Sequence, residues 1–315
     1  MRVIFYGTPD FARPTLDALL ARHQVVTVVT QPDRPAGRGQ RLAASAVKRR
    51  AQDAGVPVLQ PARLRDPEWP ARLAALAADV AVVAAFGQIL PQAVLDAPAR
   101  GSINVHASLL PRYRGAGPIA WSIIRGETET GITTFQMDAG MDTGEMLLRE
   151  ATPIGPEETA GELTGRIATA SAGAVAEVVE QIAQGRVRWR PQPEDGVTLA
   201  PKLSAADAEL DFREGAAALV RRVRALAPSP GASTRIDGDR LGILAARAQA
   251  GPVDAEPGTL RRGSDPLLRI ATGDGWLVPL VVQRAGGRAL AIDAFLRGRS
   301  LADGTKLGAG LDCSG

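Results

Sequence analysis

Short apolar segments alternate with segments of helical periodicity along the first half of the chain. Residues 80–85 form a nearly continuous apolar run, which is typical of a strand that is covered on both faces. Such β-α-β-α alternation predicts an α/β domain with a doubly wound, mostly parallel sheet. The other expected strands cover residues 3–6, 25–30, 56–59, 103–105 and 131–137, and the expected helices cover residues 11–21, 45–54, 67–78 and 159–184.

The second half of the chain has a different pattern, which begins after a polar, proline-containing segment. A helical segment at residues 214–227 is followed by short strands, and strands spaced in this way are typical of a small β-barrel. The turn signals between them are Asp237-Gly238, Gly273-Asp274-Gly275 and Gly286-Gly287. We therefore predict a first domain over residues 1–189, a linker over residues 190–205 and a second domain over residues 206–315.

The composition excludes several classes of protein and site. The chain has 315 residues, enough for about two domains. Its single cysteine, Cys313, excludes an intrachain disulfide, and its two histidines, His23 and His106, make a multi-histidine metal site improbable. The longest apolar run is far shorter than the roughly 18 residues of a membrane span, and the first residues lack a signal peptide. We expect a monomeric, cytoplasmic protein without a bound metal.

The first turn between strand and helix, residues 7–11, has the sequence Gly-Thr-Pro-Asp-Phe. A dinucleotide-binding turn would instead carry Gly-x-Gly-x-x-Gly, which lets the backbone approach a pyrophosphate. The predicted sheet is therefore Rossmann-like, but the turn argues against a nicotinamide dinucleotide.

Two polar side chains lie two residues apart in a predicted strand that runs into a Gly/Pro-rich loop. Because side chains alternate along a strand, Asn104 and His106 point to the same face. In open α/β sheets the ligand crevice lies at the carboxyl ends of the strands. An amide donor and an imidazole at such an end indicate a candidate active site. The alternative is a buried polar pair that only satisfies nearby backbone groups.

A second candidate segment, residues 135–145, leaves another predicted strand and is rich in Asp and Gly. It carries Asp138, Asp142 and Glu145. A carboxylate beside an imidazole orients the ring and stabilises its charged form. The alternative is an ordinary turn, since Asp and Gly are common turn residues.

The third segment, residues 31–41, is an unusually long and basic connection for an α/β unit. Its arginines are Arg34, Arg38 and Arg41. A basic loop of this kind suits contacts with RNA phosphates, and the alternative is a solvated run of charge. A further basic cluster, Arg221, Arg222 and Arg224, lies on the predicted helix 214–227, where we expect it to face away from the core.

Together these segments resemble one known family. The matching motifs are Gly7-Thr-Pro-Asp-Phe11, Gln31-Pro-Asp-Arg-Pro-Ala-Gly-Arg-Gly39, Asn104-Val-His106, Ser108-Leu-Leu-Pro111 and Met141-Asp-Thr-Gly144. Their order and density resemble the methionyl-tRNA formyltransferases, a branch of the folate-dependent formyltransferase family. The resemblance extends over nearly the whole chain, and the arginine-rich loop is its most branch-specific part.

The resemblance implies transfer of a formyl group from 10-formyltetrahydrofolate to the methionine amino group of initiator methionyl-tRNA, for translation initiation. It implies a Rossmann-like catalytic domain and an OB-like second barrel that binds tRNA. The implied catalytic residues are Asn104, His106 and Asp142, and the implied folate contacts are Ser108, Leu109, Leu110 and Pro111. The implied tRNA contacts are Arg34, Arg38 and Arg41.

Two positions depart from the family pattern, where Ala107 replaces the usual glycine and Gly117 the usual alanine. If residue 107 needs a positive φ, alanine costs on the order of 1 kcal/mol there.

Three other functions remain open at this level. The nearest is a folate-dependent formyltransferase for an amino-sugar nucleotide or a small ribonucleotide, which the basic loop and the second domain disfavour. The second is a nicotinamide oxidoreductase, and the third is a non-catalytic RNA-binding protein.

Overall fold

The computed structural model describes residues 1–36, 41–265, 267–299 and 301–308. These residues form two compact units. The first unit comprises residues 1–118, 129–153 and 164–201, and the second comprises residues 119–128, 154–163 and those that follow 201. The domain boundaries predicted from the sequence, at residues 189 and 206, remain a proposal.

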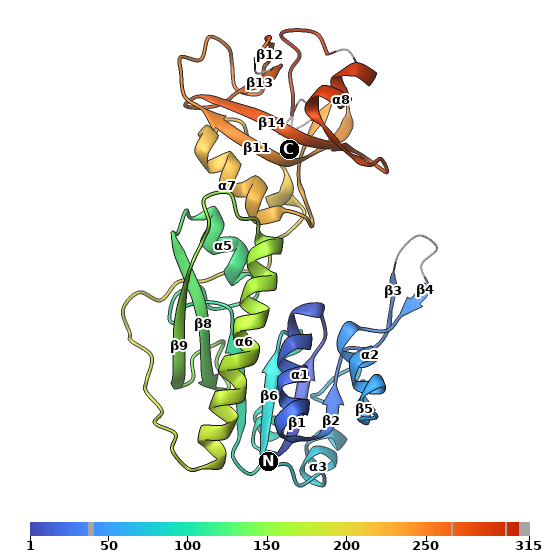
Figure 1. Ribbon diagram of the computed structural model, residues 1–315, viewed down its shortest axis with the longest axis vertical. Coiled ribbons are helices and arrows are strands. Elements are labelled where there is room, and N and C mark those ends of the chain that lie inside the picture. Colours follow the sequence, from blue (N-terminus) through green and yellow to red (C-terminus); the bar gives the residue numbers. More distant parts are fainter. Residues whose placement is uncertain (37–40, 266, 300, 309–315) are drawn as a thin grey trace. The chain divides into compact units, whose positions relative to one another are not determined.

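The first unit is built on a seven-stranded sheet with the order β5-β2-β1-β6-β7-β8-β9 (Figure 1). The strands from β5 to β7 are parallel, and the two remaining pairings, β7 with β8 and β8 with β9, are antiparallel. This topology confirms the predicted doubly wound, mostly parallel sheet. The strands are β1 Arg2–Gly7, β2 Gln24–Val29, β5 Val58–Leu59, β6 Val80–Ala84, β7 Ser102–His106, β8 Glu129–Gln136 and β9 Met146–Pro153.

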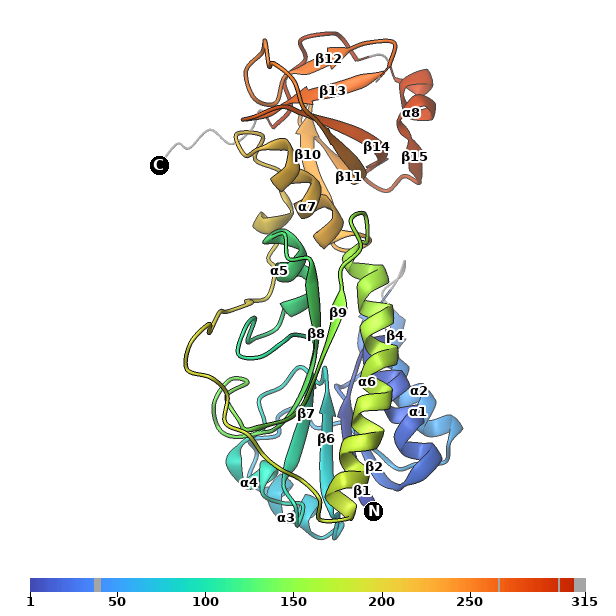
Figure 2. The same cartoon turned by 60° about the vertical axis from the view of Figure 1, so that its left-hand side comes forward.

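Helices cover both faces of this sheet. In Figure 2, α1, α2 and α6 lie on one side of it, and α3 and α4 lie on the other. Their bounds are α1 Arg13–Arg22, α2 Ala46–Asp53, α3 Glu68–Ala74, α4 Gln92–Leu95 and α6 Ala160–Ala183. Helix α6 has an apolar stripe at helical spacing, Val175, Val178, Val179 and Ile182, and this stripe is buried. Because of the double cover, consecutive residues of β1 such as Ile4 and Phe5 are both fully buried.

Some elements of the first unit were not predicted. The basic segment expected to be a loop forms a hairpin of β3 Arg34–Ala36 and β4 Arg41–Ala43. The segment is rich in Pro and Gly, which are depleted in strands, so its sequence does not indicate these two strands. Strand β9 lies at the sheet edge with half-exposed and exposed side chains, so it lacks a continuous apolar pattern. The helix predicted over residues 67–78 ends at Ala74. Beyond it, Leu76 and Ala77 donate to Leu73 and Ala74 in tighter turns, and Ala77 has a positive φ of 47°.

The second unit contains the predicted short antiparallel strands. Its sheet has the order β10-β11-β14-β13-β12, and β15 pairs with the same edge of β14 as β13 does. All three predicted turn signals connect antiparallel neighbours, which confirms the fold class of this region. The elements are α5 Pro118–Ile124, α7 Ala216–Leu226, β10 Ala232–Ile236, β11 Asp239–Gln249, β12 Leu260–Arg262, β13 Leu268–Ala271, β14 Trp276–Arg284, β15 Ala289–Ala291 and α8 Ile292–Gly298.

The basic cluster of α7 lies away from the buried face of the helix, as predicted, but its three side chains are half-buried. Arg221 donates to the carbonyl oxygen of Ile124 at 3.2 Å, and Arg224 donates to that of Gly155 at 2.8 Å. Arg222 pairs with Glu214 at 3.1 Å. All these partners belong to the second unit. Arg221 and Arg224 fasten its separate segments to α7, and Arg222 pairs within its own segment, so the cluster does not form a free phosphate-binding face.

We predict that Leu16→Ala lowers the free energy of unfolding by about 2–5 kcal/mol, because Leu16 is fully buried and its loss leaves a cavity. Leu42→Ala is the matched control. Leu42 is 73% exposed in the β3–β4 hairpin, and its replacement should change stability by less than about 0.5 kcal/mol. Urea unfolding of both variants checks this. Equal losses would contradict the position of Leu16 in the core.

Candidate functional site

Strand β7 brings the first two candidate residues to the carboxyl end of the parallel strands. It pairs with β6 on one side and with β8 on the other, so its backbone is held from both sides. Asn104 pairs with Phe135 and His106 with Thr133, and the two side chains share one face, as the spacing predicts. His106 is the last residue of the strand, where the chain leaves the sheet.

The imidazole of His106 lies between two acceptors. Its Nε2 is 2.8 Å from the carbonyl oxygen of Tyr113, and its Nδ1 is 3.6 Å from Oδ2 of Asp142. Because a carbonyl can only accept, Nε2 carries a proton in this arrangement. The side chains of His106 and Asp142 are only 7% and 15% exposed. The structure thus brings together two candidates that lie 36 positions apart, and the carboxylate is placed to stabilise a charged ring.

Asp142 is held in an unfavourable backbone conformation, with a φ of 55°. A non-glycine residue in this region costs on the order of 1–2 kcal/mol, so other contacts must fix it. One of them is the backbone N–H of Gly115, which donates to Oδ2 of Asp142 at 2.7 Å. The same oxygen therefore accepts from Gly115 and faces the ring of His106.

The other acidic residues of this loop have different surroundings. Oδ1 of Asp138 accepts from the backbone N–H of Gly140 at 3.0 Å and from the hydroxyl of Thr143 at 2.7 Å. Glu145 has an exposed side chain, and its carbonyl oxygen accepts from the backbone N–H of Gln136. Asp138 therefore shapes the turn, whereas Asp142 meets the imidazole.

The side chain of Asn104 is half-buried beside this pair. Within the described parts of the chain, its carboxamide makes no hydrogen bond. A half-buried amide without a protein partner is suited to donate to a bound group, because a polar group left unpaired carries a desolvation cost.

The segment Ser108 to Pro111 forms a fixed turn. The hydroxyl of Ser108 donates to the carbonyl oxygen of Arg112 at 2.6 Å, and the hydroxyl of Thr133 donates to the carbonyl oxygen of Ser108 at 2.7 Å. Ser108 and Leu110 are fully buried, while Leu109 is half-buried. A ligand at this turn would therefore meet the side chain of Leu109 and the backbone.

The two departures from the family pattern fit the structure. Ala107 is not among the residues with a positive φ, so the strain considered for it does not arise. The backbone N–H of Gly117 donates to the carbonyl oxygen of Ala200 at 3.0 Å.

Polar contacts of Asp33 hold the start of the basic hairpin in place. Asp33 pairs with Lys48 at 2.6 Å and accepts from Gln60 at 2.8 Å, and these contacts hold the pKa of Asp33 below its usual value. Arg34 is exposed and donates to Oε1 of Gln31 at 3.2 Å. Arg41 pairs with Ala36 across the hairpin, and Arg38 lies outside the described residues.

Residues 190–201, here called the strap, contact the loop of Tyr113 and Arg114 beside the site. They include most of the segment predicted as a linker, residues 190–205, whose bounds remain a proposal. The backbone N–H of Tyr113 donates to the hydroxyl of Thr198 at 2.8 Å. The backbone of Arg114 exchanges two hydrogen bonds with the strap, to Thr198 at 2.9 Å and from Ala200 at 2.7 Å. Thr198 and Tyr113 were missed because single bridges leave no periodic signal.

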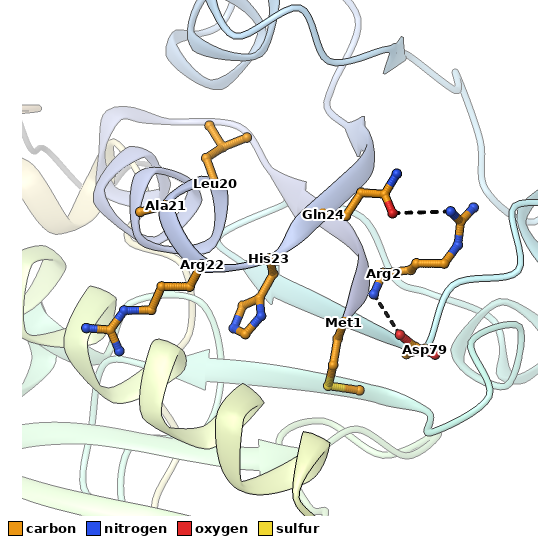
Figure 3. A pocket seen from close by; sticks show the side chains of 8 residues that line it. All are labelled: Met1, Arg2, Leu20, Ala21, Arg22, His23, Gln24 and Asp79. Atoms are coloured by element: carbon orange, nitrogen blue, oxygen red, sulfur yellow. Dashed lines mark hydrogen bonds between the residues drawn. The ribbon is translucent and has the colours of Figure 1, made fainter.

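A separate cavity of about 480 Å³ lies at the amino end of the parallel strands (Figure 3). Arg2 is one of the residues that line it, and it donates from its backbone to Asp79 at 2.7 Å and from its side chain to Gln24 at 3.4 Å. His23 is half-buried here, and burial is the main cause that lowers its pKa. These residues join strand starts and lie at the other end of the sheet from His106. The remaining lining residues are Met1, Leu20, Ala21 and Arg22.

Comparisons with known proteins agree on one family. The family model described as "Formyl transferase" matches residues 1–179, and the model described as "Formyl transferase, C-terminal domain" matches residues 202–300. A methionyl-tRNA formyltransferase from Acidiphilium cryptum is 50% identical over 98% of this chain and 100% of its own length. One from Chromohalobacter salexigens is 51% identical over 98% of this chain and 97% of its own length.

Solved structures share the fold at lower identity. An N-formyltransferase from Helicobacter canadensis, in complex with folinic acid and dTDP-3-aminofucose, has a TM-score of 0.66 at 16% identity and covers 90% of this chain and 99% of its own. HypX from Aquifex aeolicus, in complex with tetrahydrofolic acid, has a TM-score of 0.63 at 18% identity, with coverage of 94% and 47%. Among the described helices, none is long and apolar enough to cross a membrane.

Proposed function

The chain belongs to the methionyl-tRNA formyltransferase family, and we propose that it carries out that family's reaction at the His106–Asp142 pair. The reaction transfers a formyl group from 10-formyltetrahydrofolate to the amino group of methionine on initiator tRNA, for translation initiation. The observation that carries the proposal is the placement of His106 against Asp142 at the end of β7, within a chain about 50% identical to its relatives over nearly their full length.

Asn104, His106 and Asp142 each have a separate role in this reaction. Attack by the amine on the formyl carbon places a negative charge on the formyl oxygen, and the Asn104 amide and a protonated His106 donate to that oxygen. Asp142 stabilises the charged ring and helps to move the proton that the attacking amine loses. The intermediate then collapses with cleavage of the bond between the formyl carbon and N10 of tetrahydrofolate, and N10 leaves with that proton. In the structure Nε2 of His106 donates to the Tyr113 carbonyl. A formyl oxygen that uses this nitrogen must therefore replace that carbonyl.

The co-substrate would lie beside the turn formed by Ser108, Leu109, Leu110 and Pro111. Folate ligands appear in two structural neighbours, which supports a folate site in this fold. The unpartnered amide of Asn104 and the half-buried Leu109 offer a polar donor and an apolar surface, which suit a formyl group on a ring-bearing carrier.

The tRNA would be held by Arg34, Arg38 and Arg41 of the basic segment, residues 31–41, and by the second domain, residues 206–315. With the α7 arginines engaged internally, the phosphate contacts of that domain must come from other residues. Arg240 on β11 and Arg284 on β14 are both exposed, and Arg284 pairs with Leu241, the residue that follows Arg240. We further propose that the protein acts as a monomer in the cytoplasm.

A comparison of acceptors tests the proposed reaction. We expect formyl transfer from 10-formyltetrahydrofolate to methionyl initiator tRNA, and no comparable transfer to free methionine, an amino-sugar nucleotide or a small ribonucleotide. Faster transfer to the amino-sugar nucleotide would replace the proposal with the function of the more distant structural neighbours.

For the catalytic groups, we predict that Asn104→Ala and His106→Ala each lower the single-turnover rate by about 10²–10³-fold, because each removes a donor to the developing charge. The single-turnover rate of Asp142→Asn should be lower than that of wild type by at least about 10²-fold, since an amide does not stabilise the imidazolium as a carboxylate does.

Asp138→Asn is the control for this series. Its remaining Oδ1 still accepts from Gly140 and Thr143, so the rate should stay within about tenfold of wild type. A larger loss at Asp138 than at Asp142 would show that the wrong carboxylate has been assigned.

For the hairpin, we predict that Arg34→Ala and Arg38→Ala weaken tRNA binding and leave folate affinity unchanged. If each contacts one phosphate, the slope of log K against log salt should shrink by about one unit per variant. Arg149→Ala is the control. Arg149 is exposed on β9, the edge strand opposite β5, and its replacement also removes one positive charge but should leave the slope unchanged. Equal slopes for all variants would mean that the hairpin arginines are only solvated.

A further inference from the structure

Gln192, in the strap, contacts both loops that surround His106. Its Nε2 donates to the carbonyl oxygen of Asp142 at 2.8 Å and to that of Gly144 at 2.9 Å. Its Oε1 accepts from Nε and Nη2 of Arg114, at 3.1 and 2.6 Å. The carboxamide is half-buried, and all its contacts lie within the first unit. These four hydrogen bonds fix which end of the amide faces which loop.

These bonds close a ring of contacts around the Asp142 carboxylate. Arg114 precedes Gly115, whose N–H donates to Oδ2 of Asp142 at 2.7 Å. Gln192 joins the side chain of Arg114 to the backbone of Asp142 itself. The Asp142 carboxylate is thereby held from its own backbone by Gln192 and from the opposite loop by Gly115, which directly follows the Arg114 that Gln192 contacts.

Such a clamp has a physical reason at this position. Asp142 has a positive φ of 55°, which an aspartate adopts only at a cost. The carbonyls of residues 142 and 144 would also need partners if the loop is to stay closed. An amide can satisfy both carbonyls through one NH₂ group and accept from an arginine through its oxygen, a combination that glutamate lacks.

The strap itself is anchored on both sides of Gln192. The backbone of Arg190 exchanges two hydrogen bonds with Met146, at 2.7 and 2.9 Å. Farther along, Thr198 and Ala200 bond to the loop of Tyr113 and Arg114. Gln192 is therefore held in place by backbone contacts that do not involve its side chain, and its side chain can be removed without releasing the strap.

From this arrangement we infer that Gln192 is a positioning residue, which holds the Asp142 carboxylate against His106. The inference rests on the proposed function, in which Asp142 stabilises the charged ring. Gln192 does not touch the reacting groups, so its effect must pass through Asp142. It should appear in the rate of formyl transfer rather than in the affinity for folate.

The test compares Gln192→Ala and Gln192→Glu with Glu194→Ala, an exposed neighbour in the strap. Both Gln192 variants should lower kcat by about tenfold with a folate KM within about twofold of wild type, because contacting groups of one network couple at this scale. Glutamate keeps the shape of the side chain and the contact with Arg114 but has no N–H donor for the two carbonyls, so Gln192→Glu should not restore kcat. Glu194→Ala should match wild type.

A double-mutant cycle shows whether the effect passes through Asp142. Adding Gln192→Ala to Asp142→Asn should lower the remaining rate by less than about twofold. A full, independent tenfold loss in that background would overturn the inference, as would a wild-type kcat in the Gln192 single variants. An inactive wild-type protein would instead overturn the proposed function, and the inference with it.

A spectroscopic measurement adds a readout that does not depend on turnover. The chain has only two histidines, so His23→Gln identifies the ring nitrogen signals of His106 in NMR spectra. At one fixed pH, Gln192→Ala should move those signals in the same direction as Asp142→Asn, and Glu194→Ala should leave them in place. Unmoved signals in Gln192→Ala would show that Gln192 supports the fold without positioning the carboxylate.

Discussion

The contact between the Asp142 carboxylate and the His106 ring sets what the rest of the first unit must provide. The two groups approach to 3.6 Å from separate segments, and both side chains are largely withdrawn from solvent. In such surroundings a charged pair interacts more strongly than in water, but only if its geometry is maintained. The sheet fixes the histidine, and the hydrogen bonds from the loop of Gly115 and from the strap fix the aspartate.

The topology explains why so many contacts are needed. Strand β8 runs antiparallel to β7 and ends with Gln136 beside Ile103, so the chain leaves it near the amino end of β7. The loop must turn back to bring Asp142 to His106 at the opposite end of that strand. A turn built by Asp138, a positive φ at Asp142 and the strap contacts together achieve this return.

The sequence was sufficient for the parts that follow from periodicity. Buried strands such as β6 and the apolar stripe of α6 carry regular patterns, and the spacing of Asn104 and His106 already placed them on one face. The sequence motifs, in their order along the chain, were sufficient to indicate the family. The strap was not predictable, because Pro191 and Pro193 and the polar residues around them resemble a linker, and its function depends on partners distant in sequence. The α7 arginines were mistaken for a free face because helical periodicity does not reveal the carbonyls they meet.

The central claim is that His106 and Asp142 act as one unit, and a double-mutant cycle between them tests it most directly. If the carboxylate works only through the ring, single-turnover formyl transfer by the double variant His106→Ala/Asp142→Asn should lie within about twofold of the slower single variant. If the two losses multiply instead, the groups act independently, and the 3.6 Å contact is not the basis of catalysis.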